Sequence, residues 1–154
     1  MSQALMDYVT ARNDAIRAVL RMLAAEHELS DEASSVLDVT DAEREVDAAA
    51  ARLAETTDAL DRDRRPVGWN EPPAAAGVIR VARVRFAKAA LRCLTAEYAD
   101  ESADADASAE YADEQLCLAA RNLAADAAER RVRTAAVHSA SLPLEWPAEA
   151  EGQP

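Results

Sequence analysis

A long stretch without helix breakers does most to constrain how this chain can fold. Between Ala74 and Ala140 there is no proline, and Gly77 is the only glycine. Both residues disfavour a helix interior, so a segment that lacks them can continue as helix for many turns. The whole chain has only 3 glycines and 6 prolines among 154 residues. This pattern predicts an all-α fold.

The segment Val78–Leu94, VIRVARVRFAKAALRCL, is predicted to be the central helix. At about 100° per residue its apolar side chains cover most of the helix circumference. A helix that is apolar around so much of its surface is normally surrounded by other helices. We therefore expect Phe86, the only phenylalanine, in the core. Asn70 and the following Pro72-Pro73 are expected to mark the start of this helix.

Two earlier apolar patterns also predict helices. The first, at about 3–26, has a face of large aliphatic residues: Leu5, Val9, Ile16, Val19, Leu20 and Leu23. The second, at about 40–62, opens with a capping-box pattern at Thr40–Glu43. Its seam is narrow: Val46, Ala49, Ala50, Leu53, Thr57 and Leu60. Because 39 residues of the chain are alanine, the core is expected to gain from close helix approach.

The stretch after Ala74 is predicted to form a helical hairpin. Asp100–Ser108 is rich in Asp and Ser and lacks large apolar residues, as a turn region would. Reflection of the sequence about Ala105 matches Cys93 with Cys117, which an antiparallel pair would bring together. The alternative is one very long helix.

Together these patterns predict an antiparallel four-helix bundle at residues 1–140 with a short extended C-terminal tail. The four helices are expected at about 3–26, 40–62, 73–101 and 107–138. Residues 141–154, the tail segment, are expected to be extended or partly disordered.

The charge of the chain is uneven. The net charge is −12, yet residues 62–92 carry 8 basic and 2 acidic residues. The acidic flanks would repel phosphate, so nucleic acid is an unlikely partner in this interpretation. No apolar run is long enough for a membrane span, and the start lacks the basic region of a secretory signal. Two cysteines then suggest reduced thiols in the cytoplasm, with a virion as the other location considered.

Basic residues form a stripe on the central helix, and a tryptophan lies in the loop before it. Arg85, Lys88 and Arg92 share one side of the predicted helix. They either pair with acidic neighbours inside the protein or form a docking surface, for an acidic protein partner in the first place and for a nucleic acid in the second. Trp69 either folds back over the end of the bundle or is an exposed anchor for a partner.

The tail segment carries three large apolar residues, Leu142, Leu144 and Trp146, at a spacing of two. Pro143 and Pro147 interrupt them, which favours an extended strand over a helix. Such a strip can lie in a groove between helices, either on its own bundle or on another subunit.

The sequence AEYADE occurs twice and places four carboxylates near the predicted turn: Glu97, Asp100, Glu110 and Asp113. Four carboxylates across two antiparallel helices could hold a hard divalent cation. The arrangement resembles the ExxE…ExxD pattern of MazG-like nucleotide pyrophosphohydrolases, although its first element ends in Asp100 where that family has Glu. The resemblance implies a magnesium-dependent nucleotide hydrolase. The simpler interpretation is a solvated acidic end of the hairpin.

A second short match involves Arg133 and His138, whose spacing fits the Rx4–6H pattern of HEPN ribonucleases. Arg21 and His27 fit the same pattern, so the match carries little information.

The sequence contains no motif that names a reaction. The leading hypothesis is therefore a non-enzymatic interaction or assembly protein, with a phage or mobile element as a candidate origin. It would need no cofactor and would bind a protein partner or a second copy of itself. The MazG-like hydrolase with magnesium and the HEPN-like ribonuclease, or its inactive relative, are the alternatives.

Overall fold

The computed structural model describes residues 1–30, 36–98 and 103–140 of the chain. These residues form four α-helices and one short 3-10 helix: α1 Gln3–Ser30, α2 Val36–Asp58, η1 Arg62–Arg64, α3 Ile79–Glu97 and α4 Ala103–Ala140. There is no strand within the described ranges, and the predicted all-α class is confirmed.

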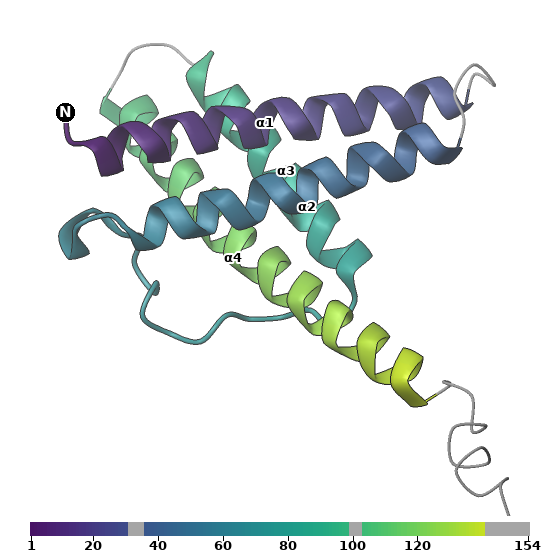
Figure 1. Ribbon diagram of the computed structural model, residues 1–154. Coiled ribbons are helices and arrows are strands. Elements are labelled where there is room, and N and C mark those ends of the chain that lie inside the picture. Colours follow the sequence, from purple (N-terminus) through teal and green to yellow (C-terminus); the bar gives the residue numbers. More distant parts are fainter. Residues whose placement is uncertain (31–35, 99–102, 141–154) are drawn as a thin grey trace, which may run out of the picture.

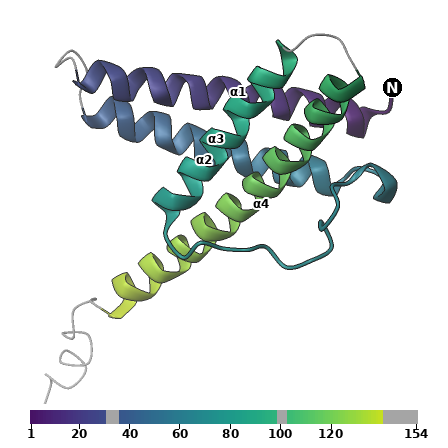
Figure 2. The same ribbon diagram turned by 180° about the vertical axis from the view of Figure 1, so that it is seen from behind.

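The four helices form two antiparallel pairs that cross each other (Figures 1 and 2). α1 and α2 pack along one another as one layer, and α3 and α4 form the other. The layers meet mainly where α2 lies against α4. α3 and α4 are separate helices, so the predicted hairpin is confirmed and the single long helix is wrong.

Small side chains line the contact between α1 and α2. On α1 the buried residues include Ala11, Ala15 and Ala18, whereas Val9 and Leu20 of the predicted apolar face are 39% and 43% exposed. The predicted face of α1 is therefore partly wrong. α2, which packs along α1, also buries alanines, among them Ala49 and Ala50. Alanine side chains let two helices approach more closely than leucine side chains would.

The predicted seam is buried along its whole length: Val46, Ala49, Ala50, Leu53 and Thr57 in α2, and Leu60 just beyond the end of the helix at Asp58, which is earlier than predicted. The start of this helix, however, was predicted wrongly. α2 begins at Val36, so Thr40 and Glu43 lie inside the helix and do not cap it. Threonine and aspartate weaken a helix interior only slightly, so a capping-box sequence does not force a helix to begin there.

Phe86 of α3 lies at the centre of the core, with no exposed surface. The other large side chains buried with it include Leu53 from α2 and Leu116 and Leu123 from α4. Its predicted burial is confirmed.

α3 begins later than predicted because the segment before it is bound to α4. The backbone N–H of Ala74 donates to Asn122 Oδ1, and those of Ala76 and Gly77 donate to the two carboxylate oxygens of Asp126, all at 2.9 Å. Gly77 has a φ of +78°, a conformation that residues with a Cβ rarely adopt. The chain therefore turns into α3 only after this glycine, and Pro72-Pro73 do not start the helix.

A buried arginine of α3 joins the two layers, on the side of α3 that faces α2. Arg83 is 8% exposed, and its Nε and Nη2 donate to the two carboxylate oxygens of Asp47 at 2.9 Å each. Its Nη1 donates to Glu43 at 3.0 Å. The hydrogen bonds to Asp47 and the two negative charges raise the pKa of Arg83, although burial alone would lower it. Arg83 is therefore held as a cation between α3 and α2.

The far end of α4 extends beyond the rest of the bundle (Figure 1). Every residue from 128 to 140 is exposed, including Val132 at 69% and Val137 at 67%. We call residues 128–140 the α4 extension.

Candidate functional site

The basic stripe (Arg85, Lys88 and Arg92) is exposed along α3. None of the three forms an ion pair with any described residue. The internal pairing considered for these residues is found at Arg83 instead. Three like charges without a counter-charge along one side of a helix raise the local positive potential.

A cleft between α3 and α4 runs beside the stripe and has a volume of about 240 Å³. Arg85 and Arg92 line its α3 wall. The remaining lining is mostly small or uncharged: Ala74, Ala76, Ala82, Ala89, Gln115, Leu118, Ala119 and Asn122, with Asp126 at one end. The lining carries two cationic arginines against the single carboxylate of Asp126, so the net charge of the cleft is positive.

Exposed apolar residues lie on the other side of the stripe. Val84 is 53% exposed and Leu91 is 39% exposed. At about 100° per residue they lie next to the stripe on the side away from the cleft. α3 therefore presents an apolar strip, a basic stripe and a cleft in that order around its exposed surface.

The α4 side chains that line the cleft were not identified from the sequence. Asp126 is 1% exposed and holds the loop before α3 in place. The signal that could have identified it is its place on the inward side of α4, three residues after the buried Leu123. An acidic residue at a core position needs buried donors as partners.

Trp69 is buried within the chain, 6% exposed, and does not form a surface anchor. Its indole N–H donates to Asp58 at 3.1 Å, and the guanidinium of Arg121 lies 4.6 Å from the centre of its ring. Arg121 also donates to the carbonyl oxygen of Trp69. Trp69 therefore fixes the loop 61–78 against α2 and α4, which agrees with the interpretation that it folds back over the bundle.

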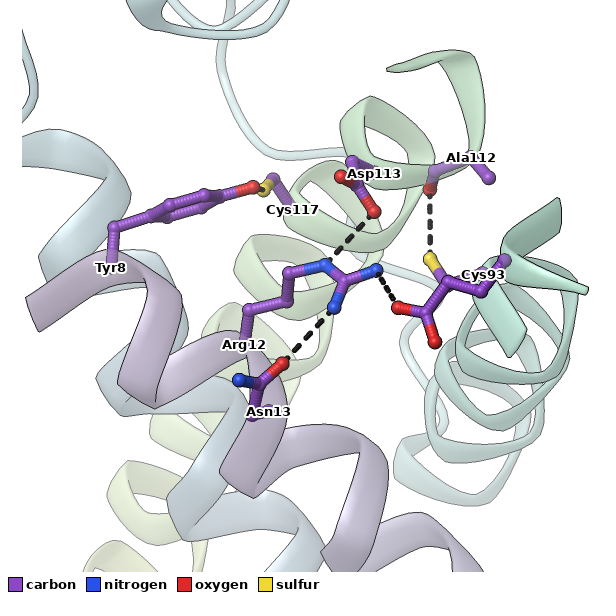
Figure 3. A network of polar contacts seen from close by, with 8 residues as sticks. Tyr8, Arg12, Asn13, Cys93, Ala112, Asp113 and Cys117 are labelled. Atoms are coloured by element: carbon purple, nitrogen blue, oxygen red, sulfur yellow. Dashed lines mark hydrogen bonds and ion pairs between the residues drawn. The ribbon is translucent and has the colours of Figure 1, made fainter. Parts of the chain in front are cut away.

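The paired carboxylates near the α3–α4 turn contact an arginine (Figure 3). Arg12 of α1 donates from Nη2 to Glu97 at 2.8 Å and from Nε to Asp113 at 3.0 Å. Burial would lower the pKa of Arg12, but its hydrogen bonds to Glu97 and Asp113 outweigh this effect and raise the pKa. The guanidinium thus occupies the position between these two carboxylates that the magnesium hypothesis gave to a metal ion.

The other two predicted metal ligands are Glu110 and Asp100. Glu110 is exposed, and Asp100 lies outside the described residues. No group of three or more His, Cys, Asp or Glu side chains suited to a metal ion occurs in the part of the chain that the structure describes. A divalent cation at Glu97 and Asp113 would have to displace Arg12.

The two cysteines are free, buried thiols with different partners (Figure 3). Cys93 Sγ donates to the carbonyl oxygen of Ala112 at 3.3 Å, and Cys117 Sγ lies 3.5 Å from the hydroxyl of Tyr8. Burial raises the pKa of Cys93 to about 12 and also raises the pKa values of Cys117 and Tyr8. These thiols are therefore kept protonated, unlike the low-pKa thiols of cysteine nucleophiles.

Alkaline pH is expected to destabilise the protein through these groups. An unfolded cysteine has a pKa of about 8.5, whereas burial raises the pKa of folded Cys93 to about 12. The stabilisation is therefore complete below the unfolded pKa and is lost as the pH rises toward the folded one. One such group contributes a slope of up to about 1.4 kcal/mol per pH unit.

Urea denaturation between about pH 8 and about pH 10 measures this loss. Cys93→Ala should lose less stability over the same interval than the wild type, because it lacks one titrating group. Equal losses in the two proteins would show that Cys93 does not titrate with folding.

Arg133 and His138, the HEPN-type pair, both lie on the exposed α4 extension. Five residues apart, they point about 140° away from each other around the helix. Arg133 is within 3.9 Å of Glu129 and donates to the carbonyl oxygen of Gly77 at 3.5 Å. The helix itself does not bring the pair together.

Leu142, Leu144 and Trp146 of the tail segment lie outside the described residues. Of the described residues that were predicted to bind a partner, the three of the basic stripe lie together and are exposed, whereas Trp69 is buried.

Comparisons of the chain with protein families, with curated proteins and with solved structures returned no match. None of the helices in the described ranges combines the length and the apolar character needed to cross a bilayer.

Proposed function

We propose that this chain is a non-enzymatic interaction or assembly protein that docks an acidic, apolar segment of a protein partner on α3. It would act as a structural, adaptor or regulatory subunit. The observation that carries the proposal is the basic stripe, three exposed cations without ion-pair partners among the described residues, beside a cleft in a chain of net charge −12.

The charge distribution supports an acidic partner. Both acidic flanks of the sequence would repel an extended polyanion such as nucleic acid, whereas a short acidic segment can contact the stripe alone. Complementary charges also speed association and select against basic partners.

The size and lining of the cleft support a polypeptide over a small molecule. Small-molecule sites usually have volumes of about 300–1,000 Å³, and this cleft has about 240 Å³. A space of this size suits one or two side chains, while Val84 and Leu91 can cover apolar residues on the other side of the stripe. Peptides that dock in grooves commonly use a few apolar anchors with charged residues around them.

The two free thiols are consistent with a reducing compartment such as the cytoplasm. We therefore propose the cytoplasm as the location of the protein.

Removal of the stripe charges is expected to weaken binding of acidic peptides by between about threefold and about 150-fold. The variant is Arg85→Gln, Lys88→Gln and Arg92→Gln, and the ligands are labelled synthetic peptides with glutamates between alternating large apolar residues. Each exposed charge pair contributes about 0.2–1 kcal/mol, so three together contribute about 0.6–3 kcal/mol, which corresponds to a loss of affinity between about threefold and about 150-fold. Fluorescence anisotropy at low salt measures the affinity.

The matched control is Arg17→Gln, Arg44→Gln and Arg52→Gln, which changes the net charge equally on the exposed side of α1 and α2. It should bind the acidic peptides as the wild type does. The proposal fails if the stripe variant and the control bind equally, if no acidic peptide binds, or if a single-stranded RNA binds the stripe in preference to the peptides.

A further inference from the structure

We infer that the occupant of the α3–α4 cleft is the tail segment of a second copy of this chain. The inference rests on the proposed function and names the partner for it. The tail segment (residues 141–154) has the sequence SLPLEWPAEAEGQP and directly follows the α4 extension.

The chemistry of the tail segment complements that of α3. It contains three glutamates, Glu145, Glu149 and Glu151, and no basic residue. The stripe supplies three cations with no described counter-charge. The segment also brings Leu142, Leu144 and Trp146, and tryptophan is enriched among residues that dominate binding energy. The cleft floor of alanines and the exposed Val84 and Leu91 offer apolar surface to them.

Chain geometry favours a second copy over the same chain. The α4 residues that line the cleft run from Gln115 to Asp126. Asp126 is the one closest to the tail segment, and a helical rise of about 1.5 Å per residue places it about 21 Å from Ala140. Trp146, six residues after Ala140, reaches at most about 20–22 Å if fully extended. Folded back on its own bundle, the segment could place Trp146 only at the rim and would leave Leu142 and Leu144 outside.

The α4 extension carries the segment in a suitable direction for a neighbour. It leads away from the bundle, and its residues 128–140 are all exposed (Figure 1). A contact between the tail segment of one copy and the cleft of the next is heterologous, so it forms a ring if the rotation closes and an open row if it does not.

Two full-length variants separate the donor from the acceptor. The donor-deficient chain carries Leu142→Ser, Leu144→Ser and Trp146→Ser, and the acceptor-deficient chain carries the three glutamine substitutions of the stripe. Light scattering over a range of protein concentrations measures the mass of each, and circular dichroism checks that each remains helical. Wild type should exceed the monomer mass of 16.5 kDa, and each variant alone should remain a monomer.

The two variants mixed in equal amounts should form a dimer and nothing larger. One intact cleft and one intact tail segment then remain in the pair, so only one contact can form. The dimer should dissociate as salt is added, because the contact includes exposed ion pairs. The control with Arg17, Arg44 and Arg52 replaced by Gln should assemble as the wild type does.

A wild type that stays monomeric at every concentration overturns the inference, and so does a donor-deficient chain with the wild-type mass. Neither result affects the proposed function, because binding of synthetic acidic peptides to the stripe is measured separately. If those peptides fail to bind as well, the proposed function fails with the inference.

Discussion

Phe86→Ala should lower the free energy of unfolding by about 3–5 kcal/mol. The ring is fully buried in the same core cluster as Leu53, Leu116 and Leu123, which come from two other helices. Truncation removes the apolar surface of the ring and leaves a cavity that these neighbours fill only in part. The neighbouring core is rich in alanine, whose side chain has no rotamer to adjust, so collapse around the cavity should be small.

Urea denaturation monitored by circular dichroism at 222 nm measures this loss. Val84→Ala is the matched control, because Val84 lies on the same helix but is 53% exposed. It should change the stability by no more than about 0.5 kcal/mol. A loss below about 1 kcal/mol for Phe86→Ala would contradict the placement of α3 in the centre of the bundle.

Arg83→Met should destabilise the protein by about 3 kcal/mol. The substitution removes three charge-assisted hydrogen bonds to Asp47 and Glu43 and leaves their carboxylates partly buried without a counter-charge. Breaking a buried ion pair costs about 3–5 kcal/mol. The lower end applies here because the side chains of Asp47 and Glu43 remain 20% and 29% exposed.

The structure offers a matched control for Arg83 in a second ion pair between helices. Arg21 of α1 lies 3.0 Å from Glu45 of α2, with both side chains more than half exposed. Arg21→Met should therefore cost no more than about 1 kcal/mol. Addition of Asp47→Leu to Arg83→Met should recover part of the loss, because the uncompensated carboxylate is removed. Similar losses for Arg83→Met and Arg21→Met would show that burial does not strengthen the Arg83 pair.

Local patterns in the sequence were sufficient to predict most of the fold. The seam of α2 and the burial of Phe86 follow from helical periodicity, because side chains three or four residues apart share a face. The α3–α4 hairpin could be predicted because the turn region lacks apolar residues and the sequences on either side match in reverse order. The face of α1 was predicted less well, because alanine gives a weak periodic signal and was given less weight than Val9 and Leu20.

Contacts between distant residues could not be predicted in the same way. Asp126 binds the backbone N–H groups of Ala76 and Gly77, which lie about fifty residues earlier in the chain. Almost every residue has a backbone N–H, so the sequence does not show which of them binds Asp126. The start of α3 depends on this contact, so it was placed too early. Arg12 is also far in sequence from Glu97 and Asp113, and repeated carboxylates alone cannot show whether a metal or an arginine lies between them.

The candidate site was predictable only in part. Periodicity places Arg85, Lys88 and Arg92 on one side of α3, and their exposure agrees with that position. Which arginine of α3 would be buried did not follow from the pattern, since Arg83 interrupts an otherwise apolar arc and needs acidic partners on another helix. The cleft beside the stripe depends on loop contacts made by α4, and no local signal describes it.

The α4 extension has a consequence for helix–coil equilibrium. Residues 128–140 are all exposed, and Arg133 donates to the carbonyl oxygen of Gly77, so tertiary contacts contribute only a little to their helical state. These residues continue a helix that is already nucleated by the packed turns before residue 128, so no new nucleation step is needed. Each further residue that joins the helix then changes the free energy of helix formation only slightly. On warming, the end of α4 should therefore unwind turn by turn while the bundle stays folded. Any molecule that binds the helical form of these residues would lengthen α4 by mass action.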